Sequence, residues 1–272
     1  MGSYFETENG KLYCSDNVTY LNTVKDNTFD LTVTSPPYDN LREYHGYTFD
    51  FENIAKELFR ITKIGGVVVW VVGDATINGS ETGTSFRQAL YFMECGFNLH
   101  DTMIYSKNGF AFPSSNRYHQ TFEYMFVFSK ETPKTFNPIK DKKNLNRVRG
   151  GMTKRNKDGT MGILKGAKYL KEWGIRFNIW CYEIGKFKVT KDEIAYSHPA
   201  IFPEQLAYDH IISWSNEGDI VLDPFIGSGT TAKMCEKSNR KWVGCEISEY
   251  YCKIAKQRIK AEADQIKLNF GG

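Results

Sequence analysis

The chain has 272 residues, of which 41% are hydrophobic and 25% charged, an ordinary composition for a globular protein with a full core. Its longest apolar run, over 67–72, is too short to form a transmembrane helix. The first residues lack the basic and apolar regions of a signal peptide, and we expect a cytoplasmic protein with no membrane association.

The formal net charge of +3 is unevenly distributed along the chain. Residues 134–176 contain 13 Lys/Arg and 3 Asp/Glu, a charge of +10, whereas the remainder contains 22 Lys/Arg and 29 Asp/Glu, a charge of −7. A basic block in an otherwise acidic chain is typical of a protein that binds a polyanion. A solvated loop interrupted by glycines is the alternative interpretation.

Cysteine and histidine give no sign of a metal site. The six cysteines form no CxxC pair, and the five histidines lack ligand spacing. We therefore predict no metal, and free thiols agree with a reducing compartment.

The first half of the chain predicts strands that alternate with helices. The segment 67–72 is apolar throughout, as is typical of a central parallel strand covered on both faces, and Gly65-Gly66 is expected to end the helix before it. The predicted strands are 11–16, 29–34, 67–72, 98–105 and 123–129, and the predicted helices are 18–24, 51–62 and 84–95.

Thr34-Ser35-Pro36-Pro37-Tyr38 follows the strand at 29–34. Two prolines forbid continuation of the strand and preset a stiff turn. Such a turn places a hydroxyl, backbone carbonyls and an aromatic ring beyond the strand end, a set that suits gripping a flat ring with an NH2 group. A loop in which the prolines only stop the strand is the simpler alternative.

After the basic block, which we interpret as an inserted module, the pattern of a globular core resumes. A helix is predicted over 203–214, with a proline at its first turn. It is followed by a strand at 220–222, a helix ending near 237, a strand at 241–245 and a helix over 249–262.

Gly227-Ser-Gly229-Thr-Thr-Ala232 fits the G-x-G-x-x-[G/A] pattern between a strand and a helix. The glycines let the backbone approach a ligand closely, and Glu246 at the next strand end can accept hydrogen bonds from ribose hydroxyls. This context favours a cofactor that contains adenosine. A plain tight turn beside a surface glutamate is the alternative.

Asp223, directly before this turn, distinguishes between two such cofactors. A carboxylate there would repel a pyrophosphate, but it could accept from the ammonium of a methionyl group. We therefore prefer S-adenosyl-L-methionine to NAD. Asp16 could complete the pocket near the adenine, or it could simply cap a helix.

Together, the two motifs resemble those of the β-class amino-group DNA methyltransferases. Asp223-Pro-Phe-Ile-Gly-Ser-Gly-Thr230 is similar to that family's cofactor motif, and Ser35-Pro-Pro-Tyr38 to its catalytic [DNS]-Pro-Pro-[YFW] motif. The order of catalytic motif, basic insertion and cofactor motif also resembles the β class. The resemblance extends over most of the chain and is weakest over about 140–176.

The resemblance implies an α/β, Rossmann-like methyltransferase fold with circularly permuted motifs. It implies a catalytic half at 1–133, a target-recognition insertion at 134–180 that binds DNA, and a cofactor-binding half at 181–272. It also makes a homodimer plausible. The implied catalytic residues are Ser35, Pro36, Pro37 and Tyr38, and those that hold S-adenosyl-L-methionine are Asp16, Asp223, Pro224, Phe225, Gly227, Gly229, Thr230 and Glu246.

The chemistry implied is methyl transfer to the exocyclic amine of a flipped base. Ser-Pro-Pro-Tyr resembles enzymes that modify cytosine N4, whereas Asp-Pro-Pro-Tyr is usual for adenine N6, so Ser35 favours cytosine and leaves adenine as the alternative. Methylation at cytosine C5 is set aside because no cysteine here follows a proline, as the nucleophile of that family does.

Three other functions stay open at this point. A methyltransferase for RNA or protein amines could use the same turn, although its cofactor motif usually comes first. A non-catalytic nucleic-acid-binding module could keep the fold, and a dinucleotide-dependent oxidoreductase is the most distant possibility.

Overall fold

The structure is a computed structural model that describes residues 2–38, 49–109, 115–145, 148–149, 153–163 and 168–270. The chain divides into two compact units. The larger comprises Met1–Asn137 and Ile179–Gly272, and the smaller is Pro138–Asn178. These bounds lie close to those of the predicted insertion, 134–180.

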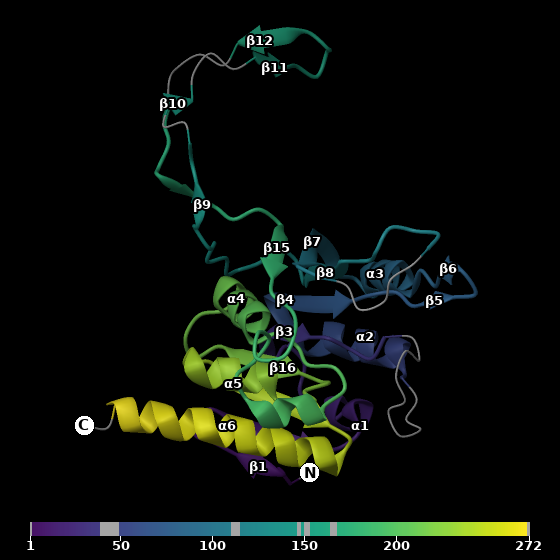
Figure 1. The fold of residues 1–272 in the computed structure, drawn as a ribbon, viewed down its shortest axis with the longest axis vertical. Coiled ribbons are helices and arrows are strands. Elements are labelled where there is room, and N and C mark those ends of the chain that lie inside the picture. Colours follow the sequence, from purple (N-terminus) through teal and green to yellow (C-terminus); the bar gives the residue numbers. More distant parts are fainter. Residues whose placement is uncertain are drawn as a thin grey trace. The chain divides into compact units, whose positions relative to one another are not determined.

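A nine-stranded sheet forms the centre of the larger unit, in the order β1-β2-β17-β16-β3-β4-β8-β7-β15. Figure 1 shows several of these strands, among them β3, β4 and β16. Strands β1 and β8 run antiparallel to their neighbours, and the other seven share one direction. The strands are β1 (Phe5–Glu6), β2 (Gly10–Cys14), β3 (Phe29–Thr34), β4 (Thr62–Val72), β7 (Asn98–Lys107), β8 (Phe122–Ser129), β15 (Ile179–Tyr182), β16 (Ile220–Asp223) and β17 (Lys241–Glu246).

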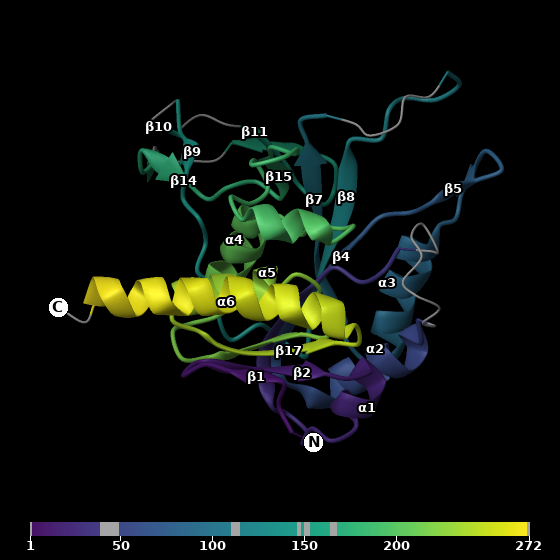
Figure 2. The ribbon, with the colours of Figure 1, turned by 60° about the horizontal axis from the view of Figure 1, so that its bottom comes forward.

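Six α-helices and one 3-10 helix accompany this sheet in the part of the larger unit that the structure describes. They form two groups, α1–α2–α3 and α4–α5–α6, and neighbours within each group pack together; Figure 2 shows the second group. The helices are α1 (Asn17–Leu21), α2 (Phe51–Ile61), α3 (Thr84–Glu94), η1 (Glu193–Ser197), α4 (Glu204–Trp214), α5 (Thr230–Lys237) and α6 (Glu249–Phe270).

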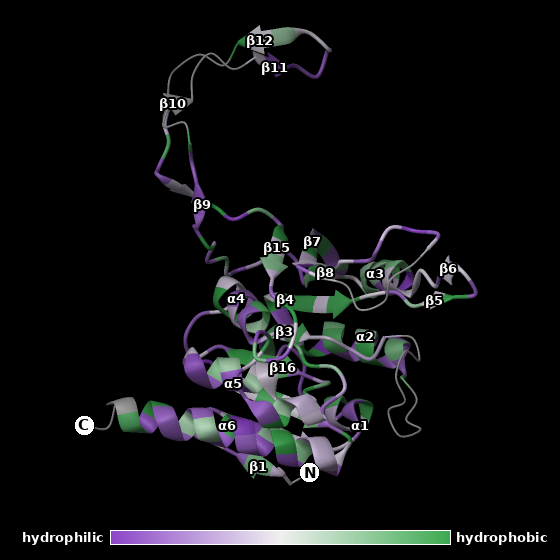
Figure 3. Cartoon of the chain, viewed as in Figure 1, coloured by the Kyte–Doolittle hydropathy of each residue, from purple (hydrophilic) through white to green (hydrophobic). Residues whose placement is uncertain are grey.

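The two helix groups cover opposite faces of the sheet. In β8, Phe126 packs into a core cluster with residues of α1, α2 and α3, whereas the adjacent Met125 contacts His210 of α4. Successive side chains of a strand point to opposite faces, so each group has its own face. A sheet covered on both sides explains why β4 is almost wholly hydrophobic (Figure 3).

Two details of the first half differ from the sequence-based predictions. Helix α2 ends at Ile61 and β4 begins at once with the extended Thr62, so Gly65 and Gly66 lie inside the strand and do not end the helix. Strand β4 is parallel to β3, as predicted, but antiparallel to β8. Burial on both faces accounts for the long apolar run, whether the neighbouring strands are parallel or antiparallel to it.

A short hairpin extends beyond β4 in the larger unit. It consists of β5 (Thr76–Ile77) and β6 (Ser80–Glu81), and both strands are exposed.

In the residues of the smaller unit that the structure describes, three successive antiparallel ladders join an outgoing and a returning stretch of chain. Most of its described side chains are exposed and hydrophilic (Figure 3). The ladders pair β9 (Lys142–Lys143) with β14 (Trp173–Gly174), β10 (Val148–Arg149) with β13 (Lys168–Tyr169), and β11 (Thr153–Arg155) with β12 (Met161–Ile163).

Candidate active site

The two sequence motifs meet at the carboxyl ends of neighbouring strands. β3 and β16 are parallel, with Leu31 beside Val221 and Thr32 beside Leu222. The turn after β3 and the glycine-rich turn after β16 therefore leave the sheet at the same edge. In open α/β sheets this edge forms the ligand-binding crevice.

A buried hydrogen bond joins the two strand ends directly. Thr34 Oγ1, at the end of β3, donates to Asp223 Oδ1, at the end of β16, over 2.6 Å. The Phe225 backbone N–H donates to the same oxygen over 3.1 Å. Burial raises the pKa of Asp223 to about 6, although these hydrogen bonds oppose the increase.

Beyond Thr34, the proline turn places its side chains as a hydrogen-bonded set. Pro36 is buried and Ser35 partly buried, and the Ser35 and Tyr38 hydroxyl oxygens lie 2.8 Å apart. Pro37 is also partly buried, and the chain beyond Tyr38, 39–48, lies outside the described residues. Stacking of the Tyr38 ring on a base remains a prediction.

Two further residues, which sequence reasoning missed, extend this set. Tyr38 Oη donates to Glu123 Oε2 over 3.0 Å, and Lys107 Nζ donates to Glu123 Oε1. Because β8 runs antiparallel to β4, its first residues lie at the edge where β4 ends. The acidic residue at the start of β8 could have been predicted to lie beside the catalytic turn, but only if the direction of that strand had been known.

The glycine-rich turn has the backbone conformation that its glycines allow. Gly227 (φ 50°) and Gly229 (φ 84°) both lie in the left-handed region. A Cβ on Gly229 would lie 3.0 Å from the Cα and Cβ of Ala255 on α6, so this turn lies directly against that helix.

Glu246, at the end of β17, holds the glycine-rich turn from the other side. Its carboxylate accepts from the Gly227 N–H over 3.1 Å and from the Ser248 N–H over 2.9 Å. Burial raises the pKa of Glu246 to about 7, because its effect is larger than the opposing effect of these backbone hydrogen bonds. The structure thus brings together the acid and the glycines that the motif predicted.

Asp16 lies at the end of the neighbouring strand and is exposed. Its carboxylate accepts from the Thr19 N–H over 2.8 Å, so it caps α1. Asn17 Nδ2 donates to the Pro224 carbonyl over 3.3 Å and joins that helix to the turn after β16. A further role of Asp16 near an adenine remains a prediction.

The remaining motif residues anchor the turn to the core. The Phe225 ring lies 5.5 Å from that of Phe49 and 6.1 Å from that of Trp70. Thr230 begins α5 and is buried.

A buried arginine below the turn was not identified from the sequence. Arg258 of α6 is 2% exposed and donates to the Ser228 carbonyl over 2.7 Å and to Thr230 Oγ1 over 3.1 Å. It also pairs with Asp192 Oδ2 and Glu204 Oε1, over 2.8 and 2.7 Å. An arginine on an amphipathic helix ordinarily faces solvent, so only the packing of α6 distinguishes this one.

The donor set fits S-adenosyl-L-methionine. Asp223 and Glu246 are two carboxylates at adjacent strand ends, one suited to an ammonium and the other to ribose hydroxyls. The glycine-rich turn lies between them and exposes no bulky side chain of its own. The two carboxylates would repel the pyrophosphate of a dinucleotide cofactor.

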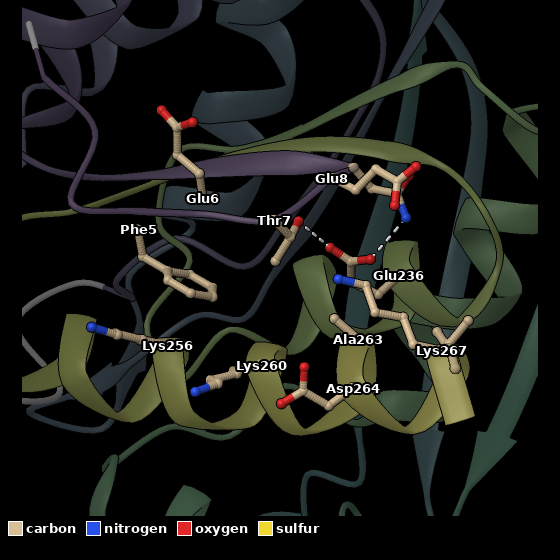
Figure 4. A pocket seen from close by; sticks show the side chains of 12 residues that line it. Phe5, Glu6, Thr7, Glu8, Glu236, Lys256, Lys260, Ala263, Asp264 and Lys267 are labelled. Atoms are coloured by element: carbon tan, nitrogen blue, oxygen red, sulfur yellow. Dashed lines mark hydrogen bonds between the residues drawn. The ribbon is translucent and has the colours of Figure 1, made fainter. Parts of the chain in front are cut away.

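A separate surface hollow lies between β1 and α6 and involves neither motif. Its lining includes Phe5, Glu236 and Lys256 (Figure 4). Glu236 there accepts from Thr7 Oγ1 and, over 2.8 Å, from Asn9 Nδ2, so its carboxylate already has partners.

Among the described residues, no cluster of His, Cys, Asp and Glu could hold a metal ion. No described helix is long and apolar enough to cross a membrane.

Comparison with known proteins identifies the family. The model of the DNA methylase family N6_N4_Mtase matches residues 29–257, which include both motifs and everything between them. The chain belongs to this family. As an amino-group DNA methyltransferase of the β class, it uses S-adenosyl-L-methionine as its cofactor.

Relatives and solved structures agree with this assignment. The orphan methyltransferase M.BamHII of Bacillus amyloliquefaciens is 61% identical over 87% of this chain and 91% of its own length. The type II methyltransferase M.HpaI of Haemophilus parainfluenzae is 29% identical over 93% of this chain and 74% of its own.

Two solved structures share the fold of this DNA methyltransferase. The cytosine-N4-specific PvuII DNA methyltransferase has a TM-score of 0.69 at 20% identity, over 97% of this chain and 94% of that one. M1.HpyAVI in complex with SAM has a TM-score of 0.57 at 22% identity, over 92% and 99%. The predicted Rossmann-like methyltransferase fold is thus confirmed.

Proposed function

We propose that this DNA methyltransferase transfers the methyl group to N4 of a cytosine flipped out of the duplex, with Ser35 and Tyr38 at the catalytic centre. The observation that carries the proposal is the hydrogen bond from Thr34 to Asp223. It ties the turn that would grip the base to the strand end that would hold the cofactor.

The residues of the turn would make the target amine reactive. An exocyclic amine is a poor nucleophile because its lone pair is delocalised into the ring. Ser35 Oγ and the Pro36 carbonyl would each accept one of its N–H groups, which localises the lone pair on the nitrogen. Positioning and fixed dipoles do this work, and no strong general base is needed.

The cofactor-binding residues would act by position and charge. Asp223 would accept from the ammonium, Glu246 from the ribose hydroxyls, and the turn at Gly227 and Gly229 would allow close backbone approach. S-adenosyl-L-methionine supplies the methyl group as an electrophile.

The smaller unit would bind the DNA. A two-stranded ribbon is narrow enough to enter the major groove, and its exposed lysines and arginines suit phosphate contacts. The Lys142 ammonium lies 4.2 Å from the ring centroid of Phe177, which is 63% exposed, so an aromatic face accompanies the positive charge. Such contacts would offset the few kcal/mol that base flipping costs.

Ser35 favours cytosine N4 over adenine N6, and the PvuII enzyme, which shares the fold, is cytosine-N4-specific, in agreement with that preference. Nucleoside mass spectrometry of unmethylated DNA, incubated with the protein and S-adenosyl-L-methionine, is the direct test. N4-methylcytosine is expected. N6-methyladenine would overturn the assignment of the base and keep the site, and the absence of both would overturn the proposal.

Substitutions at the turn test the catalytic assignment. Ser35→Ala and Tyr38→Ala should leave the dissociation constant for the cofactor unchanged and reduce turnover by about 10²-fold, the loss typical of one preorganised polar group. Full turnover in either variant would remove that residue from the catalytic centre.

A further inference from the structure

Four polar side chains from three segments form a continuous hydrogen-bonded series at the catalytic turn. Ser35 contacts Tyr38, Tyr38 donates to Glu123, and Lys107 donates to Glu123. Glu123 and Lys107 form an ion pair whose side chains are only 18% and 26% exposed. The sequence motif contains the first two of these residues and gives no sign of the others.

Gly73, directly after β4, lies beside this series. A Cβ at Gly73 would lie 3.5 Å from Glu123 Cγ and 3.6 Å from Tyr38 Cε2. The side chains of Glu123 and Tyr38 therefore lie next to each other, close to the end of β4.

The series has a direction, because each group has a fixed capacity to donate. An ionised carboxylate only accepts, so the single phenolic proton of Tyr38 is used toward Glu123. The Tyr38 oxygen then has only lone pairs to offer Ser35, and Ser35 must donate its own proton to Tyr38. Both lone pairs of Ser35 Oγ are left, and they can accept an N–H of another molecule.

We propose that Glu123 and Lys107 are positioning residues that make the Ser35 hydroxyl an acceptor for the target amine. This inference rests on the proposed function of Ser35. Without the pair, the Ser35 proton is free to point at the incoming N–H group, which is also a donor, and the two donors would oppose each other.

Lys107 makes the effect of one substitution unusually specific. In Glu123→Gln, the side-chain oxygen should turn to the Lys107 ammonium, because an amide NH2 there would place two donors together. The amide NH2 then faces Tyr38 and donates to it. Tyr38 in turn donates to Ser35, whose proton is forced outward, so the direction of the whole series is reversed.

The decisive experiment compares single-turnover methylation rates of the wild type, Glu123→Gln, Glu123→Ala and the double variant Lys107→Met/Glu123→Gln. We expect Glu123→Gln to lose about 10²-fold in rate, as for loss of one preorganised polar group, and Glu123→Ala to lose less. In the double variant the amide is free to turn its oxygen to Tyr38, so much of the rate should return.

The opposite pattern would mean that the pair only anchors Tyr38. In that case the isosteric glutamine would retain more activity than alanine, and removal of Lys107 would add to the defect. Either result overturns the proposal. Tyr38→Phe provides a second check, because in that background Glu123→Gln should have no further effect.

Measurements of folding and binding distinguish these outcomes from a loss of rate caused by unfolding or by weaker binding of DNA or cofactor. The melting temperature and the dissociation constants for DNA and cofactor should be similar in the wild type and Glu123→Gln, since a change in hydrogen-bond direction acts on the reacting amine alone. Glu123→Ala removes the ion-pair partner of Lys107 and should melt at a lower temperature, so all rates are compared at a temperature at which every variant is folded. A wild-type protein that methylates no DNA would instead refute the proposed function, which this comparison takes as its starting point.

Discussion

Replacing Asp223 by asparagine should stabilise the apoprotein while weakening its hold on the cofactor. The pKa of Asp223 is raised from 3.8 to about 6 by burial, so the folded state binds more protons than the unfolded state between those values. The contribution of Asp223 to stability therefore falls as the pH rises through this interval and is constant above it. Asparagine Oδ1 can still accept from Thr34 and from the Phe225 N–H, and it carries no charge to bury.

The shift sets the size of the effect. At about 1.36 kcal/mol per pKa unit, an ionised Asp223 costs the fold about 3 kcal/mol at pH 8 and about 0.6 kcal/mol at pH 4. Asp223→Asn should recover up to these amounts. Losing the charge opposite the ammonium should raise the dissociation constant for S-adenosyl-L-methionine by about 30-fold or more.

Urea unfolding at pH 4 and pH 8, with calorimetric titration of the cofactor, measures both quantities. Asp264→Asn, at an exposed carboxylate on α6, controls for the loss of one negative charge. The reasoning fails if Asp223→Asn is less stable than the wild type at pH 8, or if its affinity for the cofactor is unchanged.

Three other changes test the neighbourhood of the glycine-rich turn. Arg258→Met removes one of the two buried cations that pair with Asp192 and Glu204, Lys233 being the other, and should cost about 1.5–3 kcal/mol in urea unfolding, whereas Lys253→Met, at an exposed ion pair, should have a much smaller effect; equal costs would show that Arg258 stabilises the fold no more than a surface charge does. Gly229→Ala should destabilise more than Gly218→Ala, because both have φ above 80° but only a Cβ on Gly229 meets α6; similar melting temperatures would refute the contact. As the pH is raised from 6 to 7, cofactor affinity should increase about tenfold because Glu246 ionises; the increase should be steeper below pH 6, where Asp223 also ionises, and affinity should level off above 7. A flat profile between pH 6 and 7 in calorimetry would show that binding does not need the Glu246 carboxylate.

Local sequence patterns predicted the elements that carry the two motifs. The strands before Ser35 and Asp223 and the helix after Gly229 lie where alternation, proline and glycine indicated. These features act within a few residues, so the sequence alone contains them. The hydrogen bond between Thr34 and Asp223 was not predicted, because the two residues are 189 positions apart and no local pattern links them.

The residues that sequence reasoning missed depend on long-range packing. Glu123 and Lys107 become neighbours of the catalytic turn only because β8 reverses direction, and no local pattern marks that reversal. Arg258 is buried because α6 lies over the glycine-rich turn, whereas Lys256 and Lys260, two positions before and after it, are exposed. The length of α6, which continues to Phe270 and not to 262, was likewise underestimated.

The insertion of the smaller unit between the two motifs has a consequence for the integrity of the chain. The catalytic and cofactor segments are separated by Pro138–Asn178 in sequence, yet β3 and β16 are held together by the sheet itself. A protease cut within that stretch, most of whose described side chains are exposed, would sever the backbone without breaking any of the ladders of the main sheet. The two fragments should remain associated as one particle that still binds cofactor, while neither fragment made alone would contain both ends of the Thr34–Asp223 hydrogen bond.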